Sequence, residues 1–370
     1  MRHLIVGMMS GTSMDGIDAA LVEFTSTSRL KVLQTGYTPY PSELRSQLNH
    51  LALHNQHVFE PSDSPLHTEL ANHYAEAARS LINTAGISPS EISAIANHGQ
   101  TVRHEPNLSP AFSIQLGDGQ LIADLTGIST LGQFRQADLA AGGQGAPLMP
   151  AFHRSIFGMS DSYYVLNLGG IGNVTRLSDP VLGFDTGPAN CLIDQWTEHH
   201  TNERYDCDGS WAKTGHINQP LLNALMSDPY FSAAHPKSTG TDYFNLDWVR
   251  GRYSHLDRIA PADVQATLLQ VTIDAVALAL QQIDARQGKV FVCGGGAKNS
   301  YLMSSLQAKL PAFDVTTTDD LNVPADWVEA VGFAWLGYCF LTHTFSNMPS
   351  VTGANSNVVL GQRFDPAGDA

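Results

Sequence analysis

The sequence predicts an α/β protein of two domains, and three observations support that prediction. Short apolar runs typical of strands alternate with longer helical patterns along most of the chain. At 370 residues the chain exceeds the length at which a single hydrophobic core usually keeps growing. A Gly-rich stretch at 140–147 interrupts the pattern after the first third. We therefore place a domain transition near residue 128.

Composition narrows the class of protein. The hydrophobic content of 43% argues against disorder, and the net charge of −15 opposes binding to nucleic acid or to an anionic membrane. The four cysteines form no C-x-x-C pair, which indicates reduced thiols in a cytoplasmic protein. The first apolar run ends at Ser10, too early for a signal peptide, and no run reaches the 18 apolar residues of a membrane span.

The first element is a hairpin over residues 5–24, in which two strand-like runs flank a turn rich in small residues. Gly11 and Gly16 remove side-chain bulk there, and Asp15 and Asp18 would repel a bare phosphate. Hydroxyls and backbone N–H groups suited to phosphate oxygens come from Ser10, Thr12 and Ser13. The turn thus indicates a phosphate site with a bound cation, and a plain Gly-Ser turn is the alternative. No Walker-type loop occurs in the chain.

Helical and strand patterns then follow in order. Residues 63–85 predict an amphipathic helix, 92–96 a short buried strand and 111–118 a further strand. A second hairpin is predicted over residues 163–177, with its turn at 169–172. It has the same order of strand, small-residue turn and strand as the first. Two such hairpins suggest two related half-domains facing each other.

The last third predicts three further elements. Residues 262–284 form a helix that is apolar nearly all round, which favours burial on more than one face. A buried strand at 290–293 runs into the triple glycine Gly294, Gly295 and Gly296. That loop suits a nucleotide resting on bare backbone, although a helix-packing turn is nearly as good an explanation. A last apolar helix spans 327–340.

Four polar residues are candidates for the chemistry. Asp185 lies in a predicted turn between two glycines and could act as a general base, or only cap the helix expected at Pro188. His98 follows a buried strand, where α/β proteins often place ligand contacts, and no ligand set completes a zinc site around it. Arg135 could bind a carboxylate or phosphate, or pair with Asp138 on the surface. Glu329 begins an apolar helix, where capping is the simpler explanation.

Taken together, these motifs resemble one family. Six blocks in family order over roughly residues 5–340 are similar to the signature blocks of anhydro-N-acetylmuramic acid kinases: GMMSGTSMDG (7–16), HGQT (98–101), GGQGAPL (142–148), NLGGIGN (167–173), GFDTGPAN (183–190) and DWVEA (326–330). The one departure is Gln133, where the family pattern leads us to expect an aspartate. The resemblance implies a two-lobed actin-like ATPase fold, ribonuclease H-like, with an active-site cleft between the lobes. The N-terminal lobe would comprise residues 1–127 plus 341–370, and the C-terminal lobe residues 128–340.

The resemblance also implies a reaction and a homodimeric assembly. Water opens the 1,6-anhydro bridge of the amino sugar, and ATP phosphorylates the released 6-oxygen, giving N-acetylmuramic acid 6-phosphate and ADP in peptidoglycan recycling. Asp185 would be the base and Glu329 would orient water or sugar, with His98, Thr101 and Arg135 as sugar contacts. The implied ATP contacts are Gly11, Thr12, Ser13, Met14, Asp15, Gly16, Asp18, Asn167, Gly169, Gly170, Gly294, Gly295, Gly296 and Lys298, with Asp15 and Asp18 as Mg²⁺ ligands.

Other activities stay open on the sequence alone. A hexokinase-like enzyme would use Asp185 on an ordinary sugar hydroxyl instead of water. An ATP sensor without catalysis would need a partner surface, for which the sequence gives no signal. A glycosidase would need a pair of carboxylates that we cannot assign without the kinase loops. The expected homodimer would make its contacts on the C-terminal lobe, and burial of helix 262–284 within that lobe is the competing explanation of its composition.

Overall fold

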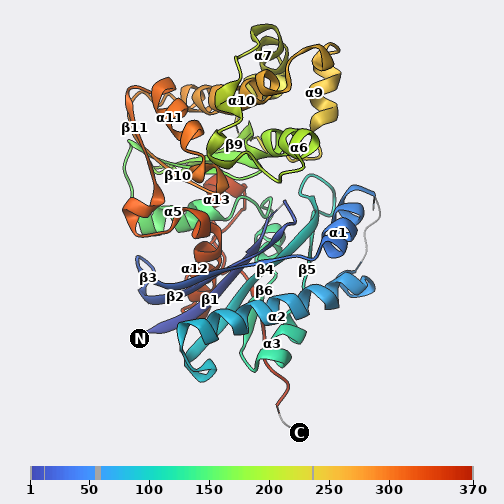
Figure 1. Ribbon diagram of the computed structural model, residues 1–370. Coiled ribbons are helices and arrows are strands. Elements are labelled where there is room, and N and C mark those ends of the chain that lie inside the picture. The colour runs from blue at the N-terminus through green and yellow to red at the C-terminus, as the bar shows by residue number, and fades with distance from the viewer. Residues whose placement is uncertain (1, 12, 55–59, 236, 369–370) are drawn as a thin grey trace. The chain divides into compact units, whose positions relative to one another are not determined.

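The computed structural model describes residues 2–11, 13–54, 60–235 and 237–368, and the chain divides into two compact units (Figure 1). Unit 1 comprises Met1–Gly158 with Trp327–Ala370, and unit 2 comprises Met159–Asp326. The C-terminal segment thus returns to the first unit. The boundaries differ from those expected at 127/128 and 340/341, because the segments 128–158 and 327–340 pack within unit 1.

Unit 1 is built on one mixed sheet. Its strands among the described residues are β1 (His3–Ser10), β2 (Gly16–Ser26), β3 (Arg29–Pro39), β4 (Ile92–Glu105), β5 (Phe112–Leu116), β6 (Thr130–Gly132) and β12 (Gln362–Phe364). The order is β12-β6-β4-β1-β2-β3, with β5 paired to β4. β1 and β2 form the predicted antiparallel hairpin, whereas β4 is parallel to both β1 and β6. The pairing of β6 with β4 explains why residue 128 is not a domain boundary.

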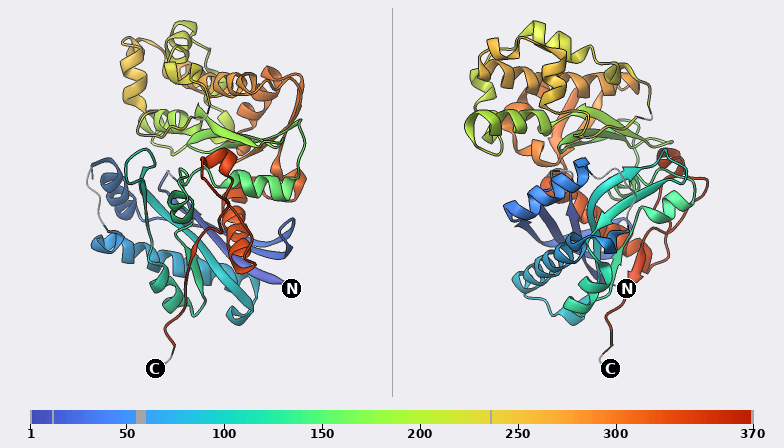
Figure 2. Two further views of the ribbon diagram at one scale, coloured as in Figure 1. Left: turned by 180° about the vertical axis from the view of Figure 1, so that it is seen from behind. Right: turned by 90° about the vertical axis from the view of Figure 1, so that its right-hand side faces the viewer.

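Helices cover both faces of this sheet. They are α1 (Ser42–His54), α2 (Pro65–Ala85), α3 (Gly119–Thr126), α4 (Gln136–Ala140), α5 (Met149–Phe157), α12 (Val328–Leu341) and α13 (Pro349–Thr352). One face packs Met8 and Ile17 against the buried side chains Leu70 and Tyr74 of α2. On the other face α12 approaches β1 so closely that a Cβ at Gly7 would clash with the carbonyl oxygen of Ala330. The last segment of the chain, red in Figure 2, then runs back along unit 1 to β12.

Unit 2 repeats the topology of unit 1. Its strands are β7 (Tyr163–Leu168), β8 (Ile171–Arg176), β9 (Leu182–Pro188), β10 (Gly288–Cys293) and β11 (Phe313–Thr317), in the order β11-β10-β7-β8-β9. The first three strands pair antiparallel, and β10 and β11 continue parallel to β7. The same sequence of antiparallel and parallel pairs runs through β6-β4-β1-β2-β3 of unit 1. The predicted relation between two half-domains is therefore present in their strand order.

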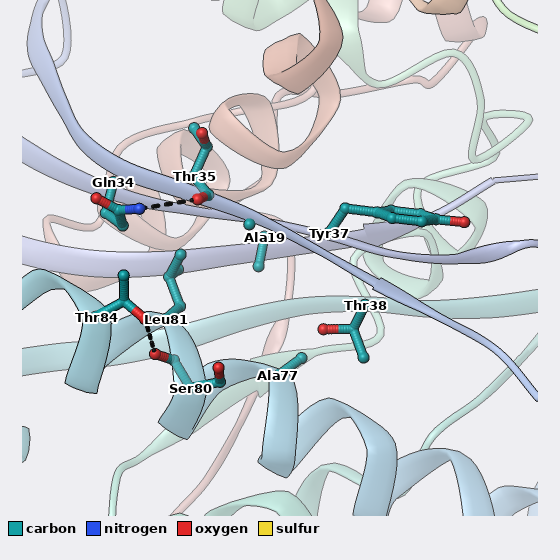
Figure 3. Close-up of a pocket in the computed structure, with 10 residues that line it drawn as sticks. Ala19, Gln34, Thr35, Tyr37, Thr38, Ala77, Ser80, Leu81 and Thr84 are labelled. Carbon is teal, nitrogen blue, oxygen red and sulfur yellow. Dashed lines mark hydrogen bonds between the residues drawn. The ribbon is translucent and has the colours of Figure 1, made fainter.

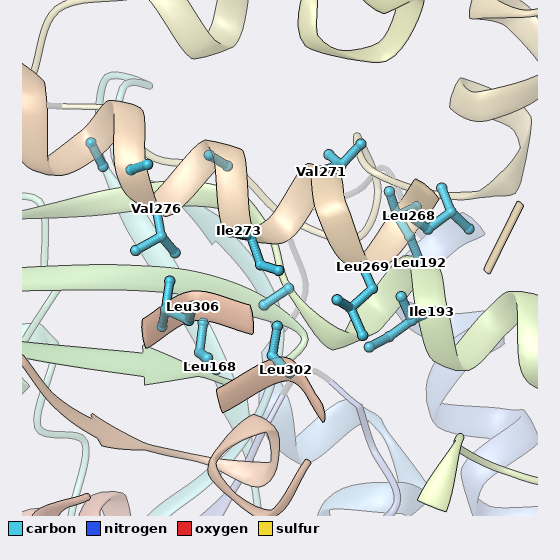
Figure 4. Close-up of a cluster of buried hydrophobic side chains, with 14 of the residues drawn as sticks. Leu168, Leu192, Ile193, Leu268, Leu269, Val271, Ile273, Val276, Leu302 and Leu306 are labelled. Atoms are coloured by element: carbon cyan, nitrogen blue, oxygen red, sulfur yellow. The ribbon is translucent and has the colours of Figure 1, made fainter. Parts of the chain in front are cut away.

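The core of unit 2 surrounds one long helix. The helices of this unit are α6 (Asn190–Thr201), α7 (Gln219–Met226), α8 (Pro229–Ser232), α9 (Leu246–Arg252), α10 (Pro261–Gln282) and α11 (Ser300–Lys309). Figure 4 shows α10 above Leu168 of β7, with Ile273 directed toward Leu302 of α11. By length and composition α10 could span a membrane, but 78% of its apolar window is buried in the protein. Burial in the core accounts for its apolar composition.

Candidate active site

The turn of the first hairpin is organised by buried polar side chains. The Ser10 hydroxyl, 1% exposed, lies 2.8 Å from the carbonyl oxygen of Gly16 and 2.6 Å from Oε1 of Gln100. Nε2 of Gln100 donates to the carbonyl oxygen of Gly11 over 3.1 Å. Met14 adopts a φ of 50° at the turn. The predicted contact Thr12 lies outside the described residues. Gln100 thus ties the described part of the turn to β4.

Asp15 and Asp18 are the carboxylates predicted to hold a cation. The Ser13 hydroxyl donates to Oδ1 of Asp15 over 2.5 Å, and Asp18 lies in β2 opposite Met9 of β1. Among the described residues no group of three or more His, Cys, Asp or Glu gathers as a metal cage. Carboxylate pairs without a full cage suit Mg²⁺, which commonly keeps waters and takes phosphate oxygens as further ligands.

The predicted sugar contacts of unit 1 come together around Arg135. Its Nη2 lies 3.0 Å from Nε2 of His98, and its Nη1 donates to the carbonyl oxygen of Gly145 over 2.8 Å. The Thr101 hydroxyl lies 3.5 Å from the same His98 nitrogen. A buried guanidinium with two of its donors fixed keeps its remaining N–H groups oriented, which suits a carboxylate or sugar oxygen.

Glu329 belongs to the same cluster through α12. Phe333, one turn further along that helix, lies 4.6 Å from the His98 ring between centroids. Burial raises the pKa of Glu329, and the charge of Arg135 counteracts part of that rise. Burial likewise lowers the pKa of Arg135 to about 10, so the guanidinium stays charged at neutral pH. The pKa of His98 lies well below its ordinary value because of burial and then the nearby Arg135 charge.

Arg135 and Asp138 do not form the surface pair considered from the sequence. Asp138 is fully buried, and its carboxylate accepts hydrogen bonds from the Gly145 amide at 2.8 Å and from the side chains of Asn347 and Thr352. Both side chains instead bind Gly145 of the Gly-rich block. The Asp138 carboxylate accepts a hydrogen bond from the Gly145 amide, and the Arg135 guanidinium donates one to the Gly145 carbonyl oxygen. The Gly-rich block at 140–147 is therefore anchored next to Arg135.

In unit 2 two of the three successive glycines predicted to contact nucleotide are tightly packed. Gly294 has a φ of 78°, and a Cβ on it would clash with Oδ1 of Asn167. A Cβ on Gly296 would lie 2.6 Å from the Cβ of Leu168. Gly295 is exposed and would meet nothing closer than 3.6 Å. The packing explanation thus accounts for Gly294 and Gly296 and does not account for Gly295.

The second hairpin turn is held by the start of α6. The amide of Asn190 donates to the carbonyl oxygen of Gly169 over 2.9 Å, and the Ala189 amide donates to Gly170 over 3.0 Å. The remaining predicted contact in unit 2, Lys298, forms an ion pair with Asp326 at 2.6 Å while its side chain stays 73% exposed. These residues share one end of the unit 2 sheet, because the turn follows β7 and the glycines follow the parallel strand β10.

The predicted base, Asp185, lies inside strand β9 and not in a turn, which corrects the sequence-based assignment. Its Oδ2 accepts a hydrogen bond from the amide of Thr239 over 3.0 Å. Burial raises the pKa of Asp185 to about 6, and the hydrogen bond from Thr239 counteracts part of that rise. A carboxyl group with a pKa close to neutral is suited to accept a proton during catalysis.

A cavity in unit 1 is separate from these residues. It measures about 70 Å³ and lies between β3 and α2, where Thr35, Thr38 and Ser80 contribute to its wall (Figure 3). None of the predicted site residues lines it. Ligand pockets are usually several times larger, at roughly 300–1,000 Å³. The cavity is therefore not a candidate for the nucleotide or the sugar.

The two units define the class of protein. Each carries the same five-strand order with a small-residue hairpin, which is the duplicated α/β arrangement expected of an actin-like ATPase fold. The family model described as anhydro-N-acetylmuramic acid kinase matches residues 3–366. The chain belongs to the anhydro-N-acetylmuramic acid kinase family.

Individual relatives give the same result. The chain is 46% identical over 363 residues to an anhydro-N-acetylmuramic acid kinase of Xanthomonas axonopodis pv. citri, covering 97% of each chain. It is 44% identical over 370 residues to one of Shewanella amazonensis, covering 99% of this chain and 100% of that one. It is 43% identical to one of Haemophilus influenzae, with 97% of each chain covered.

Several residues of the site carried no signal of their own in the sequence. In the sequence Gln100 is only one position of the HGQT motif at 98–101, yet in the structure it fixes the first hairpin turn through Ser10 and Gly11. Asn190 donates from Nδ2 to the carbonyl oxygen of Leu168 over 2.8 Å, which ties α6 to the end of β7. Thr239 reaches Asp185 from 54 positions along the chain, and only the folded structure brings the two together.

Proposed function

We propose that this protein uses ATP to convert 1,6-anhydro-N-acetylmuramic acid to N-acetylmuramic acid 6-phosphate. A water oxygen attacks C1, the bond between C1 and O6 breaks, and O6 takes the γ-phosphoryl group while ADP leaves. Asp185 takes the proton from the attacking water. The observation that carries the proposal is the Asp185 carboxylate in β9, which the Thr239 amide holds at Oδ2 and whose pKa desolvation raises to about 6, a value suited to accepting a proton.

The β1–β2 turn is the proposed phosphate contact. Amide and hydroxyl groups between Gly11 and Gly16 would bind the β- and γ-phosphates, because phosphoryl transfer depends mainly on positioning and charge neutralisation. Asp15 and Asp18 would hold Mg²⁺, which neutralises phosphate charge when bound. The ties from Gln100 to Ser10 and Gly11 support this role, because they fix the turn before the nucleotide arrives.

The Arg135 cluster is the proposed sugar contact. Arg135 would bind the lactyl carboxylate of the substrate, because a guanidinium pairs with a carboxylate through two parallel hydrogen bonds. His98 and Thr101 would contact sugar oxygens, and Glu329 would orient water or sugar. Contacts of Arg135 with His98 and Gly145 support this assignment, because they leave the guanidinium little freedom to reorganise on binding.

The end of the unit 2 sheet is the proposed contact for the rest of the nucleotide. Gly295 would lie against the adenosine, since it is the one glycine of its loop that packing does not require. The turn residues Gly169 and Gly170 and the side chain of Asn167 would contribute donors beside it. Lys298 would add positive charge, which its ion pair with Asp326 partly compensates.

An assay with two sugars tests the proposal. The protein is incubated with ATP and either 1,6-anhydro-N-acetylmuramic acid or ordinary N-acetylmuramic acid, and the phosphorylated product is quantified. We expect product from the anhydro sugar alone. A preference for the ordinary sugar would favour a hexokinase-like activity instead. ADP release without sugar phosphate would favour an ATPase of another kind.

The proposal also includes the cellular location and the oligomeric state of the protein. We expect a cytoplasmic protein, in agreement with four free cysteines among the described residues, three of them buried. We also expect a homodimer with contacts on unit 2. Burial of α10 in its own core removes the helix composition as an argument for that dimer, so the expectation rests on the family alone. Sedimentation at micromolar concentration tests it, and a monomer there would contradict it.

A further inference from the structure

Residues of α8 and of the segment that follows it form three hydrogen bonds with Asp185. The Asp185 amide donates to the carbonyl oxygen of Lys237 over 3.1 Å. The Tyr230 hydroxyl donates to the carbonyl oxygen of Asp185 over 2.8 Å. The Thr239 amide donates to Oδ2 of the carboxylate over 3.0 Å. The backbone and the side chain of Asp185 are thus held by residues that lie 45 to 54 positions further along the chain.

This segment is itself anchored. The ammonium group of Lys237 donates to the carbonyl oxygens of Tyr230 and Phe231 at 3.1 and 3.3 Å and lies 4.8 Å from the centre of the Tyr230 ring. The buried carboxylate of Asp228 accepts from the Tyr230 amide at 2.8 Å and forms an ion pair with Arg252 of α9. The Tyr230 hydroxyl is therefore held at its position independently of Asp185.

We infer that Tyr230, Lys237 and Thr239 are positioning residues for Asp185, and that they assign different tasks to its two carboxylate oxygens. Oδ2 is engaged by the Thr239 amide, whereas no described residue donates a hydrogen bond to Oδ1. Oδ1 is then the oxygen that accepts the proton of the attacking water. The inference takes the role of Asp185 as base from the proposed function. The hydrogen bonds around Asp185 are observed independently of that role.

Charged groups near Asp185 are few among the described residues. Lys237 lies over the face of the adjacent Phe184 ring, 5.8 Å from its centre, and His235 stacks on the same ring at 5.3 Å. Tyr230 is also titratable, and burial followed by the Asp185 charge raises its pKa further above neutral. On the neighbouring strand β8 the residue paired with Asp185 is the uncharged Asn173. The Thr239 amide is therefore the contact that most directly favours the ionised form of the carboxylate.

Two matched pairs of variants test the inference. Thr239→Pro removes the amide that bonds Oδ2, because proline has no N–H, and Ser238→Pro is its control, since the Ser238 amide bonds no described residue. Tyr230→Phe removes the hydroxyl on Asp185, and Tyr253→Phe is its control, a half-buried tyrosine of the same unit whose hydroxyl bonds no described residue. Melting curves first confirm that each variant is folded.

Two readouts separate positioning from general structural damage. Carbon-13 NMR titration of the Asp185 carboxyl should show its pKa raised in Thr239→Pro by about half a pH unit or more relative to Ser238→Pro. In Tyr230→Phe, kcat should fall about 3- to 10-fold with an unchanged KM for ATP, whereas Tyr253→Phe should match the wild type. The inference would be overturned by two results together. These are an equal Asp185 pKa in Thr239→Pro and Ser238→Pro, and an equal kcat in Tyr230→Phe and Tyr253→Phe. A wild type inactive on the anhydro sugar would refute the proposed function, while the NMR titration would still decide the role of Thr239.

Discussion

Nη2 of Arg135 lies 3.0 Å from Nε2 of His98, and since a guanidinium can only donate, the histidine nitrogen must accept. His98 is therefore the neutral tautomer with its proton on Nδ1. The same guanidinium reaches the carbonyl oxygen of Gly145 with Nη1. Two donors of a rigid fork are thus used for positioning, and the proposed function assigns the remaining donors to the substrate.

Arg135→Lys should weaken sugar binding more than nucleotide binding. A lysine keeps the charge but cannot reach His98 and Gly145 together or pair bidentately with a carboxylate. We expect kcat/KM for the anhydro sugar to fall about 10- to 100-fold, with the KM for ATP within about twofold of wild type. Steady-state kinetics with each substrate varied in turn measures both. Arg103→Lys is the control, because Arg103 pairs with Glu105 and lies over Phe112 instead. Equal losses in the two variants would contradict the assignment.

Asp185→Asn should abolish most activity and yet stabilise the protein at neutral pH. The folded-state pKa of about 6 lies above the unfolded value of 3.8, so the carboxyl favours folding at low pH and that contribution is lost as pH rises through 6. Asparagine removes the buried charge and can still accept the Thr239 hydrogen bond. We expect the free energy of unfolding to rise by about 1–3 kcal/mol at pH 7–8, with no gain near pH 4. Denaturant titrations at both pH values measure this, and a less stable variant at pH 8 would refute it.

The elements with strong hydrophobic patterns could be predicted from the sequence. The helix predicted at 63–85 is α2, the helix at 262–284 is α10, and both hairpins form where expected. β9 was missed because Gly183, Gly187 and Pro188 disfavour strands locally. Pairing with β8 overrides that preference in the folded chain. The half-exposed edge strand β3 was missed for the related reason that it shows no regular alternation of apolar residues.

Within the site, residues close together in sequence motifs were predictable and long-range partners were not. His98 and Thr101 belong to one motif and contact each other, whereas Arg135, grouped with them only through the family resemblance, reaches His98 from 37 positions along the chain. The partners of Asp185 come from a segment without a motif, and their contact depends on how α8 and α9 fold around Asp228. Contacts over that separation follow from tertiary packing, which local sequence patterns do not encode.

Buried histidines should make the protein lose stability below about pH 6.5. Burial lowers the pKa of His153 to about 3 and that of His98 well below 6.5, so both stay neutral when folded and become charged when unfolded. Stability is therefore full above pH 6.5 and falls as the pH drops, by up to about 1.4 kcal/mol per pH unit for each histidine. Chemical denaturation between pH 7.5 and 4.5 measures the slope. His153→Gln should reduce it, and an unchanged slope in that variant would argue against this cause.

Glycine substitutions should separate packing from nucleotide contact in unit 2. Gly294→Ala introduces a clash with Asn167 at a positive φ, so we expect a loss of about 1–3 kcal/mol in the free energy of unfolding. Gly295→Ala has room for its methyl group and should fold normally, but it should raise the KM for ATP if adenosine lies against it. Melting curves and ATP kinetics of both variants test the pair. A normal KM for ATP in Gly295→Ala would remove that residue from the nucleotide site.

The origin of the oxygen at C1 tests the central claim most directly. The enzyme is run with ATP and 1,6-anhydro-N-acetylmuramic acid in oxygen-18 water, and the product is analysed by mass spectrometry and NMR before its anomers equilibrate. If Asp185 activates water, one label appears at C1 with inverted configuration, and the phosphoryl group carries none. The label at C1 should form at least about 100-fold more slowly in Asp185→Asn. A phosphorylated product without label at C1, or an undiminished rate in the variant, would contradict the mechanism.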